Sequence, residues 1–199
     1  MEKKLEVSVI SPVFNERENL KTFVDSVTKV MHSTGMSWEL IVVDDGSDDG
    51  STTVIKELTN QDNIKCLILA KNYGQTTAIQ AGFDNAIGKY LVTLDSDLQN
   101  DPKDIPALLH KLIEEELDLV VGWRKNRKDN YFLRNLPSSI ANKLIGNITG
   151  VKLHDYGCSL KAYRADVLKE VRLYGEMHRF IPAWMATKIP ASKISELVV

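Results

Sequence analysis

The stretch LVTLDSDLQNDP, residues 91–102, passes from an apolar run into a crowd of carboxylates. The apolar run predicts a buried strand over residues 90–94, and Asp95 and Asp97 follow at its carboxyl end. Side chains two apart on an extended segment point the same way, so these two can face one ion while Ser96 turns aside. Because like charges repel and a carboxylate that leaves water needs a positive partner, a bound cation is the simplest explanation of the pair.

Strand-like and helix-like segments alternate along most of the chain. The expected strands cover residues 6–13, 38–43, 64–69, 90–94 and 117–121. The expected helices cover residues 19–31, 51–58 and 102–116, with another around residues 78–83. This alternation predicts an α/β fold with a mostly parallel, Rossmann-like central sheet flanked by helices. The length of 199 residues and the hydrophobic content of 43% suit one domain over residues 1–199.

Polar residues follow four of the predicted strands. They are Asn15 and Glu16, Asp44 and Asp45, Lys71 and Asn72, and Asp95 and Asp97. Ligands of such sheets gather at the carboxyl ends of the strands, so the four clusters predict a single site. Asp44, expected as the first residue beyond its apolar strand, is placed there to accept hydrogen bonds from a base or a ribose.

The types of ligand indicate which ion and which substrate to expect. Oxygen ligands without a nearby histidine or cysteine favour a hard ion such as Mg²⁺ or Mn²⁺, and Gln99 joins them if the extended geometry continues. Such an ion completes its shell with water and phosphate oxygens, which predicts a nucleotide diphosphate ligand. Neither a G-x-x-x-x-G-K-[ST] nor a G-x-G-x-x-G phosphate loop occurs, which argues against P-loop and dinucleotide-binding enzymes.

Other polar residues near these clusters are expected to have local roles. Asp101 is well placed to cap the helix that starts at Pro102. Asp48, Asp49 and Ser51 are expected to form a turn and a cap for the helix that follows them.

The overall composition argues against several classes of protein. A net charge of −2 and a charged content of 26%, without a long tract of one sign, give no indication of nucleic-acid binding. Cys66 and Cys158 lie far apart and follow no metal-ligand spacing, which favours reduced thiols in a reducing compartment. The N-terminus lacks the apolar core of a signal peptide, and no run approaches the roughly 18 apolar residues that span a bilayer.

Five segments occur in an order and spacing that resembles the inverting GT-A glycosyltransferases. They are SVISPVFNERENL, IVVDDGSDDGS, KNYGQTTAIQAGF, TLDSDLQNDP and VVGWRKNR, and DYGCSLKAYR and YGEMHRFIP extend the resemblance to nearly the whole chain. Within that class the chain is similar to polyprenyl-phosphate sugar transferases, the relatives of dolichol-phosphate mannose synthase and of bacterial undecaprenyl-phosphate glucosyltransferases. The resemblance implies metal-dependent transfer of a sugar from a UDP- or GDP-linked donor to a polyprenyl phosphate. It also implies peripheral contact with the cytoplasmic face of a membrane.

The resemblance also implies roles for individual residues. Those that would hold the nucleotide sugar are Pro12, Phe14, Asn15, Glu16, Asp44, Lys71, Gly74, Asp95, Ser96 and Asp97. Those that would hold the metal and the diphosphate are Asp95, Asp97 and Gln99, and those placed at the lipid phosphate are Arg124, Arg134 and Ser138. Phe14 stands where this family often has tyrosine, and Lys71 stands where arginine is frequent, so both bear on the choice of nucleotide.

The acceptor determines what catalysis requires. Arg124 and Arg134 belong to a basic segment after the fifth strand, and the planar fork of arginine suits a phosphate. A phosphate monoester is already mostly ionised at neutral pH, its second pKa being about 6, so no general base is required and direct displacement predicts inversion. Asp155 then acts as a base, orients an arginine or has no role in the site, and the role of Lys161 is equally open. The solvated-loop interpretation is favoured for Lys125 and Lys128.

Two alternative functions and two structural questions stay open at this point. A saccharide or protein hydroxyl acceptor would need Asp155 as a working base, and a noncatalytic module would bind nucleotide sugars without turnover. Residues 178–189 form either an interfacial helix or a helix packed on the sheet. The final ISELVV reads as a strand, after which family members normally continue into a basic segment and often into membrane helices, so we expect a truncated or shortened relative.

Overall fold

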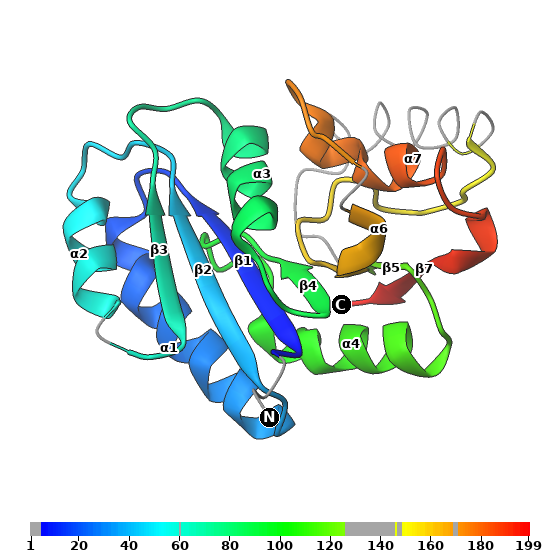
Figure 1. The fold of residues 1–199 in the computed structure, drawn as a ribbon, viewed down its shortest axis with the longest axis horizontal. Coiled ribbons are helices and arrows are strands. Elements are labelled where there is room, and N and C mark those ends of the chain that lie inside the picture. The colour runs from blue at the N-terminus through cyan, green and yellow to red at the C-terminus, as the bar shows by residue number, and fades with distance from the viewer. Residues whose placement is uncertain (1–4, 60, 126–145, 147–148, 169–170) are drawn as a thin grey trace.

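A seven-stranded sheet forms the centre of the chain in the computed structural model, which describes residues 5–59, 61–125, 146, 149–168 and 171–199 (Figure 1). The strands are β1 (Val7–Val13), β2 (Trp38–Asp44), β3 (Ile64–Ile68), β4 (Tyr90–Thr93), β5 (Leu119–Trp123), β6 (Lys161–Arg164) and β7 (Ile194–Val198). Their order is β3-β2-β1-β4-β6-β5-β7, which runs from β3 at the left of Figure 1 to β7 at the right.

The sheet is mostly parallel, as the alternation of elements predicts. Strands β3, β2, β1 and β4 pair in parallel, and β7 pairs in parallel with β5. Only β6 runs in the opposite direction, between β4 and β5. The strands β1 and β2 are buried along their whole length, which fits their nearly continuous apolar sequences. The expected strand at the end of the chain is confirmed as β7.

The helices flank this sheet. They are α1 (Arg17–Thr34), α2 (Ser51–Leu58), α3 (Gln75–Asn85), α4 (Ile105–Glu114), α6 (Ala165–Leu168) and α7 (Ile181–Met185), with 3₁₀ turns η1 (Pro102–Asp104), η2 (Met177–Phe180) and η3 (Ala191–Lys193). Helix α1 buries one apolar stripe made by Leu20, Phe23, Val24 and Val27, as its helical spacing predicts. Helix α3 packs on β1 so closely that a Cβ at Gly82 would collide with Ile10.

Strand β6 is the element that the sequence pattern does not reveal. It consists of four residues, KAYR, and begins with a buried lysine, so neither length nor alternation marks it as a strand. Its register aligns Lys161 with Thr93 of β4 and with Val121 of β5. The loop before β6, residues 151–160, is thereby brought beside the carboxyl ends of both strands. No helix among the described residues is long and apolar enough to cross a bilayer.

Candidate active site

A pocket of about 290 Å³ lies where β1, β2 and β4 end. It is lined by Pro12, Val13, Phe14, Glu16, Asp45, Asn72, Gly74, Gln75, Asp95, Ser96 and Asp97. Seven of these residues are ones that the sequence analysis assigns to nucleotide-sugar binding. The expectation that separate polar clusters meet at one edge of the sheet is therefore met for the clusters after β1, β2 and β4 and for the loop after β3.

The two carboxylates at the end of β4 line this pocket. Burial raises the pKa of Asp95, and the charge of Asp97 raises it further, whereas hydrogen bonds from Ser159 and Gln75 and the charge of Lys161 act in the opposite direction. The Asp95 Oδ1 atom accepts a 2.7 Å hydrogen bond from Gln75 Nε2. The Asp97 Oδ1 atom accepts a 3.1 Å bond from the backbone N–H of Gln99, which closes a tight turn.

This pair of residues fits a divalent cation. Two carboxylates that face one pocket repel each other, and the raised pKa of Asp95 records a cost that a cation would offset. The described residues contain no cluster of three or more His, Cys, Asp and Glu side chains that could hold a metal. Further ligands must therefore be oxygens of bound substrate, water or other side chains, the arrangement typical of Mg²⁺ or Mn²⁺ on a diphosphate. Gln99 is exposed and does not line the pocket, so only its backbone is seen to support the pair.

The two aspartates at the carboxyl end of β2 have different environments. Asp44 is the last residue of β2 and is fully buried; its carboxylate accepts hydrogen bonds from the Ser47 N–H, at 3.0 Å, and from the Thr52 hydroxyl. It lies outside the pocket lining, contrary to its expected position beyond the strand. Asp45 lines the pocket instead. The sequence predicts no separate role for Asp45, although successive residues at a strand end point in opposite directions and that alternation distinguishes the two.

Asp45 holds the loop that follows β3. Its two oxygens each accept a 2.8 Å hydrogen bond, from the backbone N–H groups of Tyr73 and Gly74. Lys71 is exposed and lies outside the pocket, with Nζ 5.3 Å from the centre of the Tyr73 ring. Gly46 comes so close to the backbone of Lys71 that any Cβ there would collide with it. The loops after β2 and β3 are therefore packed together at the pocket rim.

The loop DDGSDDGS also supports the segment that follows β1. The backbone N–H of Asn15 donates to Ser47 Oγ and its Oδ1 accepts from the Asp48 N–H, both at 3.0 Å. Asn15 itself is exposed, has a φ of 57° and does not line the pocket. The predicted local role of Asp49 is confirmed, because its carboxylate accepts from Ser51 N–H at 2.8 Å and also from Arg17 N–H at 3.1 Å, at the start of α1.

The cap prediction for Asp101 also agrees with the structure, whereas the N-cap position of α2 is Gly50, which makes no side-chain cap bond. Asp101 caps η1 by accepting a 3.0 Å hydrogen bond from the Lys103 N–H. Burial opposes ionisation of Asp49, but hydrogen bonds from Ser51 and Arg17 outweigh it and lower its pKa.

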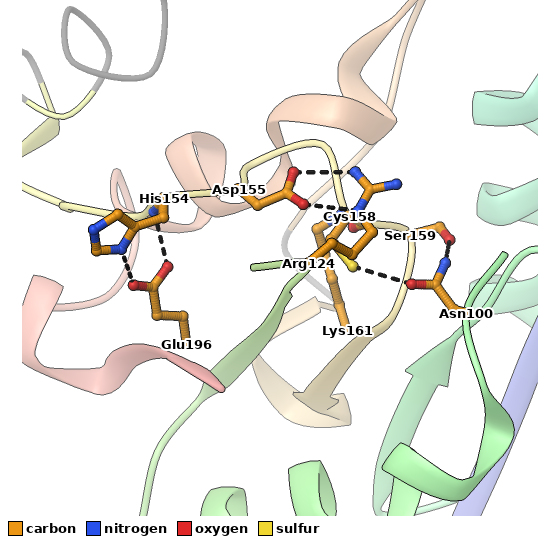
Figure 2. Close-up of polar contacts among 8 residues, drawn as sticks. All are labelled: Asn100, Arg124, His154, Asp155, Cys158, Ser159, Lys161 and Glu196. Atoms are coloured by element: carbon orange, nitrogen blue, oxygen red, sulfur yellow. Dashed lines mark hydrogen bonds and ion pairs between the residues drawn. The ribbon is translucent and has the colours of Figure 1, made fainter. Parts of the chain in front are cut away.

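Figure 2 shows a second polar cluster, which contains Arg124, Asp155 and Lys161. Lys161 and Arg124 both interact electrostatically with Asp95 of the acidic pair. Arg124, the residue after β5, binds the Asp155 carboxylate through both Nε, at 2.7 Å, and a terminal nitrogen, at 3.1 Å. Burial lowers the pKa of Arg124, but the hydrogen bond and charge of Asp155 raise it, and the net shift is upward. Asp155 is thus placed to orient an arginine, one of the roles considered for it. Arg134 and Ser138 lie outside the described residues.

Buried polar groups connect the two clusters. Asn100 Nδ2 donates to Ser159 Oγ at 2.9 Å, and the Cys158 thiol donates to Asn100 Oδ1 at 3.5 Å (Figure 2). Lys161 is buried and donates to the carbonyl of Cys158. Burial lowers the pKa of Lys161, and Cys158, Asp95 and Asp155 oppose that shift. Sequence reasoning missed Ser159 and Asn100 because no local pattern links them; only β6 brings them together.

The segment after residue 177 includes a short helix that packs on the core. Ile181 and Met185 are buried against the core, so α7 packs its apolar side inward. Phe180 and Trp184 nevertheless stay exposed, at 38% and 47%. His178 is buried, and its Nδ1 lies 2.6 Å from Thr76 Oγ1 in α3.

A profile of the family described as Glycosyl transferase family 2 matches residues 8–172. The dodecaprenyl-phosphate galacturonate synthase of Rhizobium johnstonii is 54% identical over 197 residues, which make up 98% of this chain and 58% of that protein. The undecaprenyl-phosphate 4-deoxy-4-formamido-L-arabinose transferase of Salmonella paratyphi B is 40% identical over 192 residues, which make up 92% of this chain and 58% of that protein. The chain therefore spans 58% of the length of these relatives.

The fold also resembles solved structures. Glucosyl-3-phosphoglycerate synthase from Mycobacterium tuberculosis, in complex with Mn²⁺, UDP-glucose and phosphoglyceric acid, matches with a TM-score of 0.73 and 17% sequence identity. The match covers 98% of this chain and 69% of that chain. At this identity the likeness shows the fold alone, and it confirms the expected GT-A fold.

Proposed function

Since this chain belongs to glycosyl transferase family 2, we propose that it transfers a sugar from a nucleotide diphosphate sugar to a polyprenyl phosphate. The observation that carries the proposal is the 54% identity, over 98% of the chain, to a dodecaprenyl-phosphate galacturonate synthase. The name of a second relative, which is 40% identical, also includes a polyprenyl phosphate, undecaprenyl phosphate. The pocket geometry supports the donor half of the proposal, and the arginine beside it supports the acceptor half.

The donor half rests on the pocket at the ends of β1, β2 and β4. Phe14 and Gly74 line it on the side of the loops, and Asp95 and Asp97 line it on the side of β4. Asp95 and Asp97 would hold Mg²⁺ or Mn²⁺. That ion would supply positive charge for the departing nucleoside diphosphate. Phe14 presents an apolar surface, 44% exposed, to the pocket, where a base can stack on it.

The acceptor half rests on Arg124. Its guanidinium is held on two nitrogens by Asp155, and its side chain is 16% exposed, so the fork is fixed before any ligand arrives. A phosphate acceptor needs no base and must only be aligned with the anomeric carbon. Because both oxygens of Asp155 are engaged by Arg124, that carboxylate orients an arginine rather than removing a proton. This favours a phosphate acceptor over a hydroxyl acceptor, and direct displacement inverts the anomeric carbon.

We further propose that the exposed aromatic residues beside η2 and α7 touch a membrane. Phe180 and Trp184 are exposed while their neighbours on α7 are buried, and Arg179 and Lys188 flank them on the surface. Aromatic rings with basic neighbours are typical of interfacial contact. Such contact would bring the domain to the phosphate of a lipid acceptor.

A panel of nucleotide sugars tests the proposal. UDP- and GDP-linked sugars, including UDP-galacturonate, are incubated with detergent-dispersed undecaprenyl phosphate and either Mg²⁺ or Mn²⁺, and labelled glycolipid is extracted. We expect glycolipid of inverted configuration that disappears in EDTA. Transfer to a sugar or peptide hydroxyl but not to the lipid would contradict the proposal that the acceptor is a polyprenyl phosphate. Nucleotide binding without any release of nucleoside diphosphate would contradict the proposal that the protein is an enzyme.

A further inference from the structure

Two consecutive residues at the end of β5 meet two consecutive residues of the loop before β6. Trp123 stacks on His154, with ring centroids 4.0 Å apart and planes inclined by 10°. The next residue in each segment forms the bidentate ion pair between Arg124 and Asp155. The strand end and the loop are therefore joined by two adjacent contacts, one aromatic and one ionic.

Each ring of the stack makes a further contact with another residue. Glu196 of β7 accepts a 2.8 Å hydrogen bond from the backbone N–H of His154 and a second bond from its ring Nδ1. Lys125, two residues beyond the end of β5, has its Nζ 5.7 Å from the centre of the Trp123 ring. Strand β7 also pairs with β5, aligning Val198 with Trp123, so three segments meet at this stack. Figure 2 shows His154 directed toward Glu196 and Asp155 directed away from it, toward Arg124.

We propose that His154, stacked on Trp123 and held by Glu196, is a positioning residue that fixes the backbone from which Asp155 orients the Arg124 guanidinium. The proposal rests on the proposed function, in which Arg124 binds the acceptor phosphate. His154 is exposed and touches neither the donor pocket nor Arg124 in any contact described above. His154 is joined to Asp155 by a peptide bond, and this bond carries its effect to the Arg124 guanidinium.

The physical reason is that a bidentate pair tolerates little rotation. Both carboxylate oxygens of Asp155 must stay in line with two guanidinium nitrogens, and a small turn of the backbone at residue 155 breaks one of the two bonds. A loop has several accessible backbone states, and the stack and the two bonds to Glu196 restrict residue 154 to one of them. Positioned charges bind and align ligands better than mobile ones because less order is lost on binding.

The first test measures the orientation of Arg124 without any catalytic readout. In ¹⁵N-labelled protein, the Nε–H signal of Arg124 is assigned by its absence in Arg124→Lys, and its exchange with water is measured. We expect slow exchange in the wild type, exchange at least about 3-fold faster in His154→Ala, and near-wild-type exchange in His154→Phe, which keeps the stack on Trp123. Glu196→Gln, which loses the charge but keeps an acceptor, should lie between the wild type and His154→Ala.

The second test measures transfer. His154→Ala should raise the KM for undecaprenyl phosphate by about 3–10-fold, because the interaction free energy of one aromatic pair corresponds to a factor of that size. The KM for the nucleotide sugar and the kcat should stay close to wild type. His154→Phe should restore most of the acceptor KM. The matched control is His32→Ala. His32 lies in the last turn of α1 and is another exposed histidine whose ring contacts a tryptophan, Trp38.

The two tests fail in distinguishable ways. Unchanged exchange of the Arg124 Nε–H in His154→Ala overturns the positioning role whatever the protein transfers. So does an equal change in His32→Ala, which would mean a general loss of stability. A wild type that makes no glycolipid but shows the expected exchange pattern contradicts the proposed function and leaves the positioning of Arg124 by His154 supported.

Discussion

Gln75 Nε2 donates a 2.7 Å hydrogen bond to Asp95 Oδ1, and this bond joins the first residue of α3 to the carboxylate that follows β4. Helix α3 is in turn seated on β1 by the close approach of Gly82 to Ile10. The rigid start of a helix therefore sets the orientation of the acidic side chain that we assign to the metal. Gln75, which belongs to the segment KNYGQTTAIQAGF, thus has a place in the site.

We expect Gln75→Ala to weaken metal-dependent nucleotide binding by about 10-fold, because hydrogen-bonding partners of metal ligands typically contribute at least that much. Calorimetric titration with the preferred nucleoside diphosphate and Mn²⁺ measures the change. Gln80→Ala is the matched control, since Gln80 bonds Asp84 at 2.9 Å on the same helix but outside the pocket. Equal affinities for Gln75→Ala and Gln80→Ala would show that the bond to Asp95 does not matter for binding.

The pH dependence of stability should report the free-energy cost of ionising Asp95 in the folded protein. Burial and the charge of Asp97 raise the pKa of this carboxyl in the folded protein. A carboxyl with a raised folded-state pKa stabilises the fold when it is protonated, and that contribution is lost as the pH rises through the folded-state pKa. Without metal, Asp95→Asn should therefore have a higher Tm than the wild type at neutral pH, and the difference should vanish below the ordinary value of 3.8.

Thermal unfolding in EDTA over a series of pH values measures this difference, and the exposed Asp25→Asn controls for loss of a carboxylate. Added Mn²⁺ should stabilise the wild type and not Asp95→Asn, because a ligand stabilises only the state that binds it. If the wild type is the more stable protein at neutral pH in EDTA, the carboxylate is not strained and the argument for a cation at this position loses its support.

Asp155→Asn should impair acceptor binding rather than chemistry. The variant leaves the partly buried Arg124 with a neutral partner, so we expect the KM for the lipid phosphate to rise by about 10-fold while kcat at saturating acceptor is retained. Steady-state kinetics with both substrates varied separates the two effects. Asp84→Asn, which breaks the surface pair with Arg172, serves as the control. Loss of kcat with intact donor binding would instead make Asp155 a general base and favour a hydroxyl acceptor.

Gly46→Ala should destabilise the fold and disturb the pocket rim. Its φ is 71°, and an added Cβ would collide with the backbone of Lys71 and Asn72, so we expect a loss of more than about 2 kcal/mol. Gly35→Ala is the matched control, because its φ of 69° is similar but nothing lies within 4 Å of the added Cβ, and backbone strain alone costs about 1 kcal/mol. Urea unfolding compares the two. Equal losses would show that the loops after β2 and β3 are free to separate.

Local sequence patterns were sufficient to predict the strands and polar residues that form the pocket proposed for the nucleotide sugar. The segments that become β1, β2 and β4 are short and rich in apolar residues, and each is followed by polar residues, so both the strands and their carboxyl ends can be read from the chain. The caps at Asp49 and Asp101 depend on neighbours within a few residues and were equally readable. The expected places of Arg134 and Ser138 stay predictions, because both residues lie outside the described part of the chain.

Contacts between distant segments could not be read in this way. Asp44 and Asp45 are adjacent and chemically identical. Asp44 is buried against Thr52 and Asp45 lines the pocket, because successive side chains at the end of a strand point to opposite sides. The bidentate pair between Arg124 and Asp155 joins residues 31 positions apart. It exists only because β6 inserts antiparallel between β4 and β5.

The sequence by itself determined the alternation of strands and helices up to β5, a mostly parallel sheet and the edge at which its polar groups collect, because hydrophobic periodicity acts over short distances along the chain. The tertiary structure alone decided that Asp45 lines the pocket, that Gln75 bonds Asp95, and that Trp123 and Glu196 hold His154 next to the pair between Asp155 and Arg124. Those outcomes depend on side-chain direction and on the packing of segments that the chain brings together only after it folds.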